Sequence, residues 1–303
     1  MSKGLPTPRA LRAAALLLAA VAGLACAGAP GPGLETDAAP LRVMTFNIRY
    51  GTAPDGENAW LRRRALLLDV IADHDPAVLG VQEAVRFQLD EIRRAMPRLG
   101  EVGVGRDDGV EAGEYSAILY DRTALTLLEG GTFWLSDTPD VPGSMTWGNR
   151  YPRVVTWARF RRAGDAGEPF LVLNTHWDHE SQNAREESAA QIVAWLASEA
   201  GDRPVVVMGD FNAGEANPAF RALVEAEARG VRLRDTFRAI HPEAGTVGTY
   251  HAFTGDRTGE KIDAVLASPG WTVVDAAIVT TARDGRYPSD HFPVTATLVP
   301  PGS

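Results

Sequence analysis

Short apolar runs alternate with amphipathic stretches along most of the chain. From Leu41 onward, runs rich in β-branched residues have the length and composition of buried strands, and other stretches repeat apolar residues at three- and four-residue steps, as helices do. The expected strands are 41–47, 77–82, 115–120, 125–134, 153–160, 169–175, 204–209, 262–267, 272–280 and 292–299. The expected helices are Trp60–Ala72, Val85–Met96, Ala184–Ser198 and Pro218–Ala228. This mixture indicates an α/β sandwich.

The first 26 residues follow a different pattern. Basic residues precede an apolar stretch at 13–22, which is too short to span a bilayer as a permanent helix. Cys26, the only cysteine in the chain, follows small and apolar residues, as in a bacterial lipobox. We therefore expect residues 1–26 to be a signal peptide of the lipoprotein type, with Cys26 lipidated and the exported protein anchored to a membrane, in the periplasm or at the cell surface. The alternative is cleavage near 25–27 by the ordinary signal peptidase, which would give a secreted soluble protein.

The remainder of the chain divides into a short linker and one domain. Residues 27–40 are rich in Gly, Pro and Ala and lack periodicity, which is typical of a flexible linker. Residues 41–300 contain no second segment of this kind, so we expect a single domain there. With one cysteine the chain forms no internal disulfide. Its formal net charge of −9 argues against nucleic-acid binding through a basic surface. The sequence indicates no protein partner, and a monomer is expected.

Small polar motifs stand at the ends of the apolar runs. Strand ends at one edge of a sandwich converge, so these motifs are expected to meet in one pocket. Carboxylate and amide oxygens there suit Mg²⁺, Mn²⁺ or Ca²⁺ rather than Zn²⁺, and histidines can transfer protons. Together they indicate phosphoester cleavage assisted by a divalent metal. The motifs are Asn47, Gln82-Glu83, Asn174-Thr175-His176, Asp210-Phe211-Asn212, Ile262-Asp263 and Ser289-Asp290-His291.

Alternative interpretations exist for these motifs. Taken singly, each could be a turn, a helix cap or a charge at a helix N-terminus. The string "NTHWDH" also resembles a zinc cluster of the metallo-β-lactamase type, centred on His176, Asp178 and His179, but Asn174 stands where that cluster needs a histidine. A third possibility is a lipid-anchored binding module that keeps the fold without turnover.

In chain order, the motifs resemble the signature of the exonuclease/endonuclease/phosphatase superfamily. They are "MTFNIRYG", "GVQEA", "NTHWDH", "GDFNA", "KIDAVLAS" and "SDHFPV", and they extend from Leu41 to Val299. The most specific part is "GDFN" followed much later by "SDH". The superfamily includes deoxyribonucleases, abasic-site endonucleases, sphingomyelinases and inositol-polyphosphate phosphatases. The resemblance implies a four-layer α/β/β/α sandwich of two mixed β-sheets. It also implies that residues 41–300 are a catalytic domain that hydrolyses phosphodiesters or phosphomonoesters.

The resemblance implies a metal site and a cofactor. Glu83 is the leading metal ligand, with Asn47 beside it and Asp290 as a possible contributor. The expected cofactor is Mg²⁺, with Mn²⁺ or Ca²⁺ as alternatives.

The resemblance also implies catalytic roles. Asp210 and Asn212 would orient the attacking water and hold the phosphate. His291 would act as base or stabilise the phosphate, oriented by Asp263, and His176 would donate to a phosphate oxygen or to the leaving group.

Several further residues are candidates for substrate contact. Arg153 suits bidentate phosphate binding, and Asp178 with His179 could extend the catalytic edge or simply begin the next helix. Lys261 is expected near the pocket mouth or in solvent. Trp134, Trp147, Tyr151 and Trp177 could stack on a base or a sugar, or pack in the core. The substrate is expected to be a nucleic acid, a phospholipid head group or a sugar phosphate.

Overall fold

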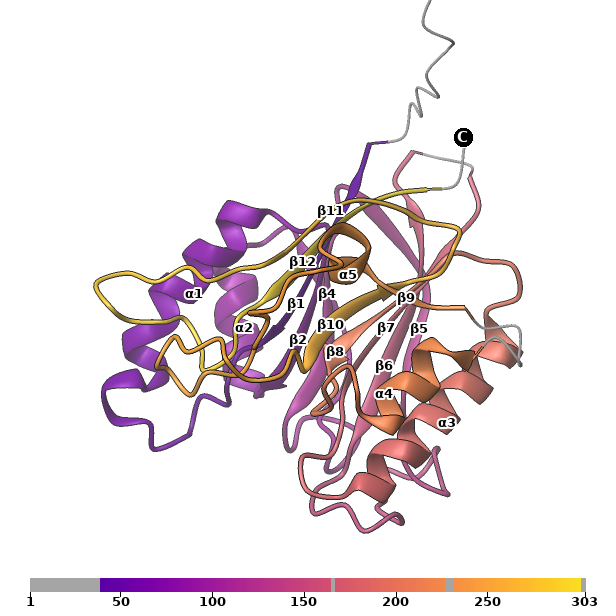
Figure 1. Cartoon of the computed structure of the whole chain (residues 1–303), viewed down its shortest axis with the longest axis horizontal. Helices are drawn as coiled ribbons and strands as arrows, with labels where there is room; N and C mark the ends of the chain where they lie inside the picture. Colours follow the sequence, from indigo (N-terminus) through magenta and orange to yellow (C-terminus); the bar gives the residue numbers. More distant parts are fainter. Residues whose placement is uncertain (1–38, 165–166, 227–231, 301–303) are drawn as a thin grey trace, which may run out of the picture. The chain divides into compact units, whose positions relative to one another are not determined.

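Two six-stranded mixed sheets stack face to face in the computed structural model, which describes residues 39–164, 167–226 and 232–300 (Figure 1). All described residues belong to one compact unit. The predicted signal peptide, Cys26 and most of the predicted linker lie outside the described residues. Among the described helices, none is long and apolar enough to cross a membrane.

The first sheet has the strand order β11-β12-β1-β2-β4-β3. Strands β1 and β2 run parallel, with Asn47 opposite Gln82, and the other pairs are antiparallel. Both faces of β1 and β2 are buried because one face meets the second sheet and the other meets helices. The bounds are β11 Thr272–Ile278, β12 Val294–Val299, β1 Leu41–Asn47, β2 Val78–Ala84, β4 Tyr115–Asp121 and β3 Leu99–Val102.

The second sheet has the order β5-β6-β7-β8-β10-β9. Its register places His176 opposite Asp210 in the parallel pair β7 and β8, and Asp263 opposite Asp210 in the antiparallel pair β8 and β10. These three side chains therefore stand in one row across three strands. The bounds are β5 Leu125–Trp134, β6 Val154–Arg162, β7 Phe170–His176, β8 Val205–Asp210, β10 Asp263–Ala267 and β9 Arg234–Asp235.

Helices cover the outer face of each sheet. Helices α1 (Trp60–His74) and α2 (Arg86–Ala95) pack on the first sheet, and α3 (Gln182–Glu199) and α4 (Pro218–Val224) pack on the second (Figure 1). In α3, the buried residues recur at three- and four-residue steps, so one stripe faces the core. A separate apolar core fills the space between the sheets. The predicted four-layer α/β/β/α sandwich is confirmed.

The shortest elements were not predicted. Strands β3 and β9, helix α5 (Thr236–Ile240) and the 3-10 helix η1 (Gly56–Asn58) are five residues long or shorter, so they carry too few apolar positions for a recognisable period. Helix α4 ends at Val224, and the last two residues of the helix predicted over 218–228 lie outside the described residues.

Candidate active site

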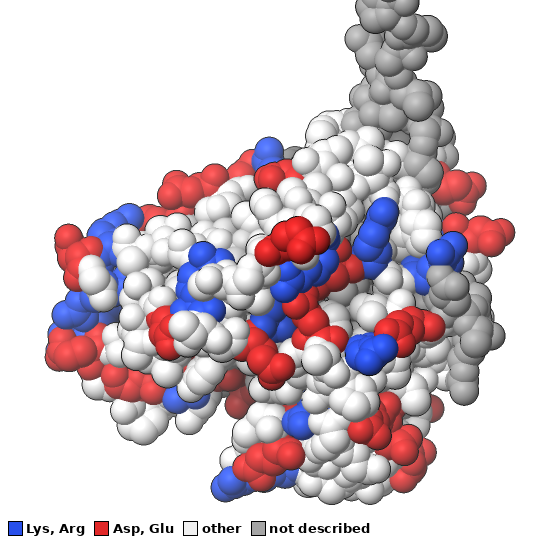
Figure 2. All heavy atoms as spheres, in the orientation of Figure 1, with Lys and Arg blue, Asp and Glu red and all other residues white. Residues whose placement is uncertain are grey.

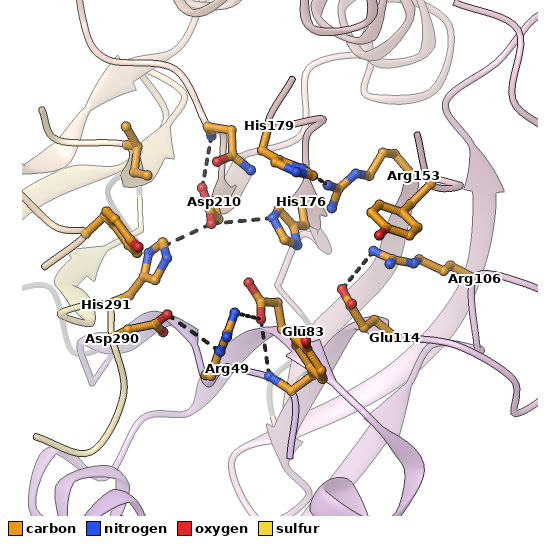
Figure 3. Close-up of a pocket in the computed structure, with 15 residues that line it drawn as sticks. Arg49, Glu83, Arg106, Glu114, Arg153, His176, His179, Asp210, Asp290 and His291 are labelled. Atoms are coloured by element: carbon orange, nitrogen blue, oxygen red, sulfur yellow. Dashed lines mark hydrogen bonds and ion pairs between the residues drawn. The ribbon is translucent and has the colours of Figure 1, made fainter. Parts of the chain in front are cut away.

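Polar strand ends from both sheets meet at one edge of the sandwich, around a cavity of about 610 Å³ (Figure 3). Strands β1 and β2 bring the first-sheet residues there, and the His176–Asp210–Asp263 row comes from the second sheet. The predicted site residues that line the cavity are Glu83, Arg153, His176, His179, Asp210, Asn212, Asp290 and His291. Asn47, Asp178 and Asp263 are buried next to it without lining it.

His291 is held by two carboxylates. Its Nδ1 donates to Oδ2 of Asp263 at 2.9 Å and lies 3.8 Å from Oδ2 of Asp210. Burial alone would lower the pKa of His291, but the negative charges of Asp263 and Asp210 raise this pKa well above its ordinary value. The imidazole is therefore protonated near neutral pH. With Nδ1 engaged, Nε2–H remains as the donor for a bound anion.

Asp210 lies at the centre of the site. Its Oδ2 accepts a hydrogen bond from Nδ2 of Asn47 at 2.9 Å, and its Oδ1 accepts one from the backbone N–H of Asn212 at 2.9 Å. Burial, followed by repulsion from Asp263, raises the pKa of Asp210 above its ordinary value. A carboxyl group whose pKa is raised in this way can accept a proton near neutral pH.

His176 faces Asp210 from the neighbouring strand. Its Nε2 is 3.5 Å from Oδ2 of Asp210, while its Nδ1 has no hydrogen-bond partner among the described residues. Burial and then the positive charges of Arg153 and Arg106 hold the pKa of His176 well below its ordinary value. The two histidines of the site therefore differ in charge, His291 being cationic and His176 neutral.

Glu83 and Asp290 present carboxylates on the first-sheet side of the cavity. Nη1 of Arg49 lies 3.8 Å from Oε2 of Glu83, and Nε of Arg49 lies 3.8 Å from Oδ2 of Asp290. Burial raises the pKa of Asp290, and the nearby Glu83 contributes to this shift. These all-oxygen donors fit Mg²⁺, Mn²⁺ or Ca²⁺.

Asn47 contacts a carboxylate from each sheet. Its Nδ2 donates to Oε1 of Glu83 at 3.0 Å as well as to Asp210, and its Oδ1 accepts the backbone N–H of Arg49 at 3.0 Å. One of the two lone pairs of its oxygen is thus engaged by the backbone. The side chain orients two carboxylates, and its role as a metal ligand stays a prediction.

A buried group of Asp210, Asp263 and His291 also has its potential ligand atoms within 4.8 Å of one another. The Nδ1–Oδ2 contact of 2.9 Å between His291 and Asp263 is the length of a charge-assisted hydrogen bond. A proton between these two atoms excludes Nδ1 as a metal ligand in this arrangement. Glu83 and Asp290, which face the open cavity, are the better-placed cation ligands.

The zinc cluster considered for "NTHWDH" does not form. Oδ1 of Asp178 accepts the backbone N–H groups of Glu180 and Ser181 just before α3, and Nδ1 of His179 lies 2.9 Å from Nη2 of Arg153. Asp178 is fully buried, with Oδ2 at 3.6 Å from Nε of Arg153. Of the two alternatives for Asp178, the structure agrees with the start of the next helix, because this carboxylate accepts the N–H groups that precede α3 and lies beside Arg153.

Other side chains differ from the prediction as well. Lys261 neither stands at the pocket mouth nor meets solvent: it is 1% exposed and forms ion pairs with Asp235 and Glu215. Trp134 and Trp177 are buried, whereas Tyr151 lines the cavity.

Sequence reasoning missed Arg49, Arg106, Glu114 and Tyr250, which also line the cavity. Arg49 follows Asn47 by two positions in "NIRYG", which is the one local signal for it. Arg106 and Glu114 belong to an irregular loop before β4 that has no periodic pattern.

Backbone strain gathers at the same place. Arg49, Glu83 and Asn212 all have positive φ angles, of 56°, 57° and 46°. Such conformations disfavour non-glycine residues and are typical of functional sites, where the surrounding structure holds them. The side-chain amide of Asn212 is further fixed by donating to the carbonyl of Trp177 at 3.0 Å.

The chain is similar in sequence and in fold to known proteins. The profile of the Endonuclease/Exonuclease/phosphatase family matches residues 44–291. The chain is 33% identical in sequence to an endonuclease/exonuclease/phosphatase from Bacteroides vulgatus. The crystal structure of that protein matches this fold with a TM-score of 0.80, over 87% of this chain and all of that one. The mannosyl-6-phosphatase of Bacteroides thetaiotaomicron VPI-5482 is 32% identical with a TM-score of 0.77, over 86% of this chain and 99% of that one. Nocturnin of Drosophila melanogaster is 24% identical over 86% of this chain, which matches 47% of its length.

Proposed function

The chain belongs to the endonuclease/exonuclease/phosphatase family, whose members hydrolyse phosphoesters, and we propose that it is a divalent-metal-dependent phosphoesterase acting outside the cytoplasm. Residues suited to acid-base chemistry face residues suited to metal binding across the cavity, and this arrangement is the main support for the proposal. The second sheet supplies the His176–Asp210–Asp263 row, and the first sheet supplies the carboxylate of Glu83. Acid-base groups thus stand opposite hard oxygen ligands.

The proposed cation site consists of Glu83 and Asp290. A divalent cation bound there would neutralise charge on the phosphoryl oxygens during hydrolysis. Asn47 would keep Glu83 and Asp210 in place through its two N–H donors. Mg²⁺ is the first candidate, with Mn²⁺ and Ca²⁺ as alternatives.

The protein's own residues would handle the water and its proton. Asp210 accepts the proton as the water oxygen attacks phosphorus, and the bond from phosphorus to the leaving oxygen breaks. Asn212, fixed by the carbonyl of Trp177, helps to orient that water. Asp210 is assigned the role of base because its raised pKa makes it a better proton acceptor than an ordinary carboxylate.

The two histidines would act as hydrogen-bond donors of different charge. His291, kept cationic by Asp263, donates Nε2–H to a phosphoryl oxygen and stabilises the charge that develops there. His176 remains neutral and donates to a phosphoryl oxygen or to the leaving oxygen. Arg153 and His179 add donors on the same side.

A sugar phosphate is the first substrate class to consider. A relative that is 32% identical and matched over nearly its full length is named a mannosyl-6-phosphatase. On the face shown in Figure 2, Lys and Arg are interspersed with Asp and Glu and form no continuous basic stripe for a nucleic acid. Phospholipid head groups and nucleic acids are the alternatives.

We further propose that residues 1–26 export the protein, that lipidated Cys26 anchors it to a membrane, and that residues 27–40 link this anchor to a monomeric catalytic domain. The basic residues, apolar stretch and lipobox-like end at Cys26 support this proposal.

Phosphate release from a panel of sugar phosphates, phospholipids and oligonucleotides tests the proposed activity. We expect turnover by the wild-type protein and its loss in His291→Ala, with both proteins folded by circular dichroism. No turnover of any ester in the panel would instead favour the non-catalytic binding module.

A further inference from the structure

One end of the cavity, beyond His176, has a wall of which the proposed hydrolysis uses only Arg153. Arg106 and Glu114 reach it from the loop before β4, and Arg153 reaches it from the segment before β6 (Figure 3). Tyr151, from the same segment before β6, also lines this end. We refer to these four residues as the distal wall. Because His176 stands between this wall and Asp210, a phosphoryl group held by His176 and His291 would direct its leaving group toward the wall.

The cations of the distal wall are each matched by a carboxylate. Nη1 of Arg106 lies 2.7 Å from Oε2 of Glu114, and Nε of Arg153 lies 3.6 Å from Oδ2 of Asp178. The wall therefore offers hydrogen-bond donors and acceptors with little net charge. A second phosphate, as in a polynucleotide, would gain little attraction here and would lie close to two carboxylates.

The two arginines of the wall have donors that make no hydrogen bond to the described residues, although each arginine has an ion-pair partner. Nε and Nη1 of Arg153 and Nε of Arg106 make no hydrogen bond within the part of the chain that the structure describes, although both residues are over 90% buried. Burial of unpaired donors is unfavourable, and a bound polar group can satisfy them. These N–H groups of Arg106 and Arg153 therefore indicate a position at which a polar ligand would bind.

Tyr151 adds an aromatic surface to the wall. The guanidinium carbon of Arg106 lies 5.2 Å from its ring centroid, and the ring of His179 stacks at 6.3 Å with an interplanar angle of 18°. The ring is nevertheless 39% exposed. An aromatic ring beside polar groups suits a ligand that has both C–H surfaces and hydroxyl groups.

We propose that the distal wall is a leaving-group subsite for a neutral polyhydroxylated group, so that the preferred substrates are phosphomonoesters of a sugar or polyol. Hydroxyl groups both donate and accept, so they can pair with the carboxylate of Glu114 and the free N–H groups of Arg106 and Arg153 at once. This inference rests on the proposed phosphoesterase activity, which defines where the leaving group lies.

Substrate preference tests the subsite. We would measure kcat/KM for mannose 6-phosphate, for p-nitrophenyl phosphate, which has no sugar hydroxyls, and for a short single-stranded oligodeoxynucleotide. In Glu114→Gln and Tyr151→Leu, the ratio of the first value to the second should fall about 10- to 100-fold, because hydrogen bonds to buried charged groups discriminate to this degree. Glu225→Gln is the matched control, since this carboxylate pairs with Arg221 at the surface and does not line the cavity.

The possible results separate the subsite from the activity. Equal losses on both monoesters, no loss on either, or faster cleavage of the oligonucleotide by the wild-type protein would overturn the subsite and leave the phosphoesterase activity intact. If the wild-type protein hydrolyses none of the three, the proposed activity fails and the subsite with it. Tyr151→Leu retains the Arg106–Glu114 ion pair, so it gives a result even if Glu114→Gln is unstable.

Discussion

Nδ1 of His291 lies 2.9 Å from Oδ2 of Asp263, and this buried pair joins the loop before β12 to the first residue of β10. Asp263 also stands in register with Asp210 on the next strand. The charge of Asp263 is thus the main reason that His291 remains protonated inside the protein. The pairing of β8 with β10 thus places the two carboxylates that keep His291 charged.

Asp263→Asn should lower the pKa of His291, because it removes the carboxylate charge that does most to offset the effect of burial. If cationic His291 stabilises the phosphoryl oxygens, kcat should fall about 100-fold or more near neutral pH. The alkaline limb of the kcat profile should also move to lower pH. A pH–rate profile with p-nitrophenyl phosphate measures both effects, and an unchanged limb would rule out this role for the pair.

Arg63 should prove essential to the stability of the first-sheet side of the site. This side chain of α1 is 3% exposed and donates to the carbonyls of Ile48, Arg49, Asn58 and Pro288 at 2.7 to 2.9 Å. Arg63→Met leaves these acceptors unpaired, and we expect the free energy of unfolding to fall by about 2–4 kcal/mol. Urea denaturation measures this loss.

Arg64→Met is the matched control for that experiment. Arg64 is the next residue on α1, and it pairs with Glu91 at 2.9 Å in a partly exposed ion pair. Its removal should change the free energy of unfolding by less than about 1 kcal/mol. Equal losses in the two variants would show that the four carbonyl contacts of Arg63 do not stabilise the fold specifically.

His251 should make the stability depend on pH in a defined window. Its ring stacks on Phe292 at 3.9 Å, and burial lowers its pKa from 6.5 to about 4. Between these two pH values the unfolded chain binds a proton that the folded protein excludes, so the free energy of unfolding decreases as the pH falls from 6.5 to 4. In His251→Phe the melting temperature should decline less steeply over this window, and an identical slope would contradict the assignment.

The proposed anchor can be tested with the full-length chain in a bacterial host. Wild-type protein should incorporate labelled palmitate and sediment with membranes, whereas Cys26→Ser should do neither, because the proposed lipid is attached through that thiol. Unlabelled wild-type protein in the soluble fraction would point to ordinary signal-peptidase cleavage.

The sequence predicted the layers of the fold and the strand ends that form the site, because both leave periodic signals. Apolar runs ending in polar motifs mark strands that stop at one edge, as Leu171–His176 and Val205–Asp210 do. The ordered motifs also predicted the family. The pairing register that places His176 and Asp263 on either side of Asp210 depends on contacts between distant strands, so no local pattern encodes it.

Side-chain orientation was the other part that the sequence did not determine. The sequence placed Asn47 beside Glu83, but it did not show that the Asn47 oxygen accepts the N–H of Arg49 while its amide N–H groups point at Glu83 and Asp210. Lys261 was expected near solvent, yet ion pairs with Asp235 and Glu215 make its burial tolerable. Both outcomes depend on partners far away in the chain.

In the proposed mechanism, hydrolysis requires a divalent cation held opposite the His176–Asp210–Asp263 row. The most direct test is to measure p-nitrophenyl phosphate hydrolysis by the purified protein after treatment with EDTA and then after addition of Mg²⁺, Mn²⁺ or Ca²⁺. We expect EDTA to abolish hydrolysis and at least one of these cations to restore it, with Glu83→Gln requiring about 10-fold more cation because one charged ligand is lost. Undiminished hydrolysis in EDTA by the wild-type protein would show that no divalent cation is required.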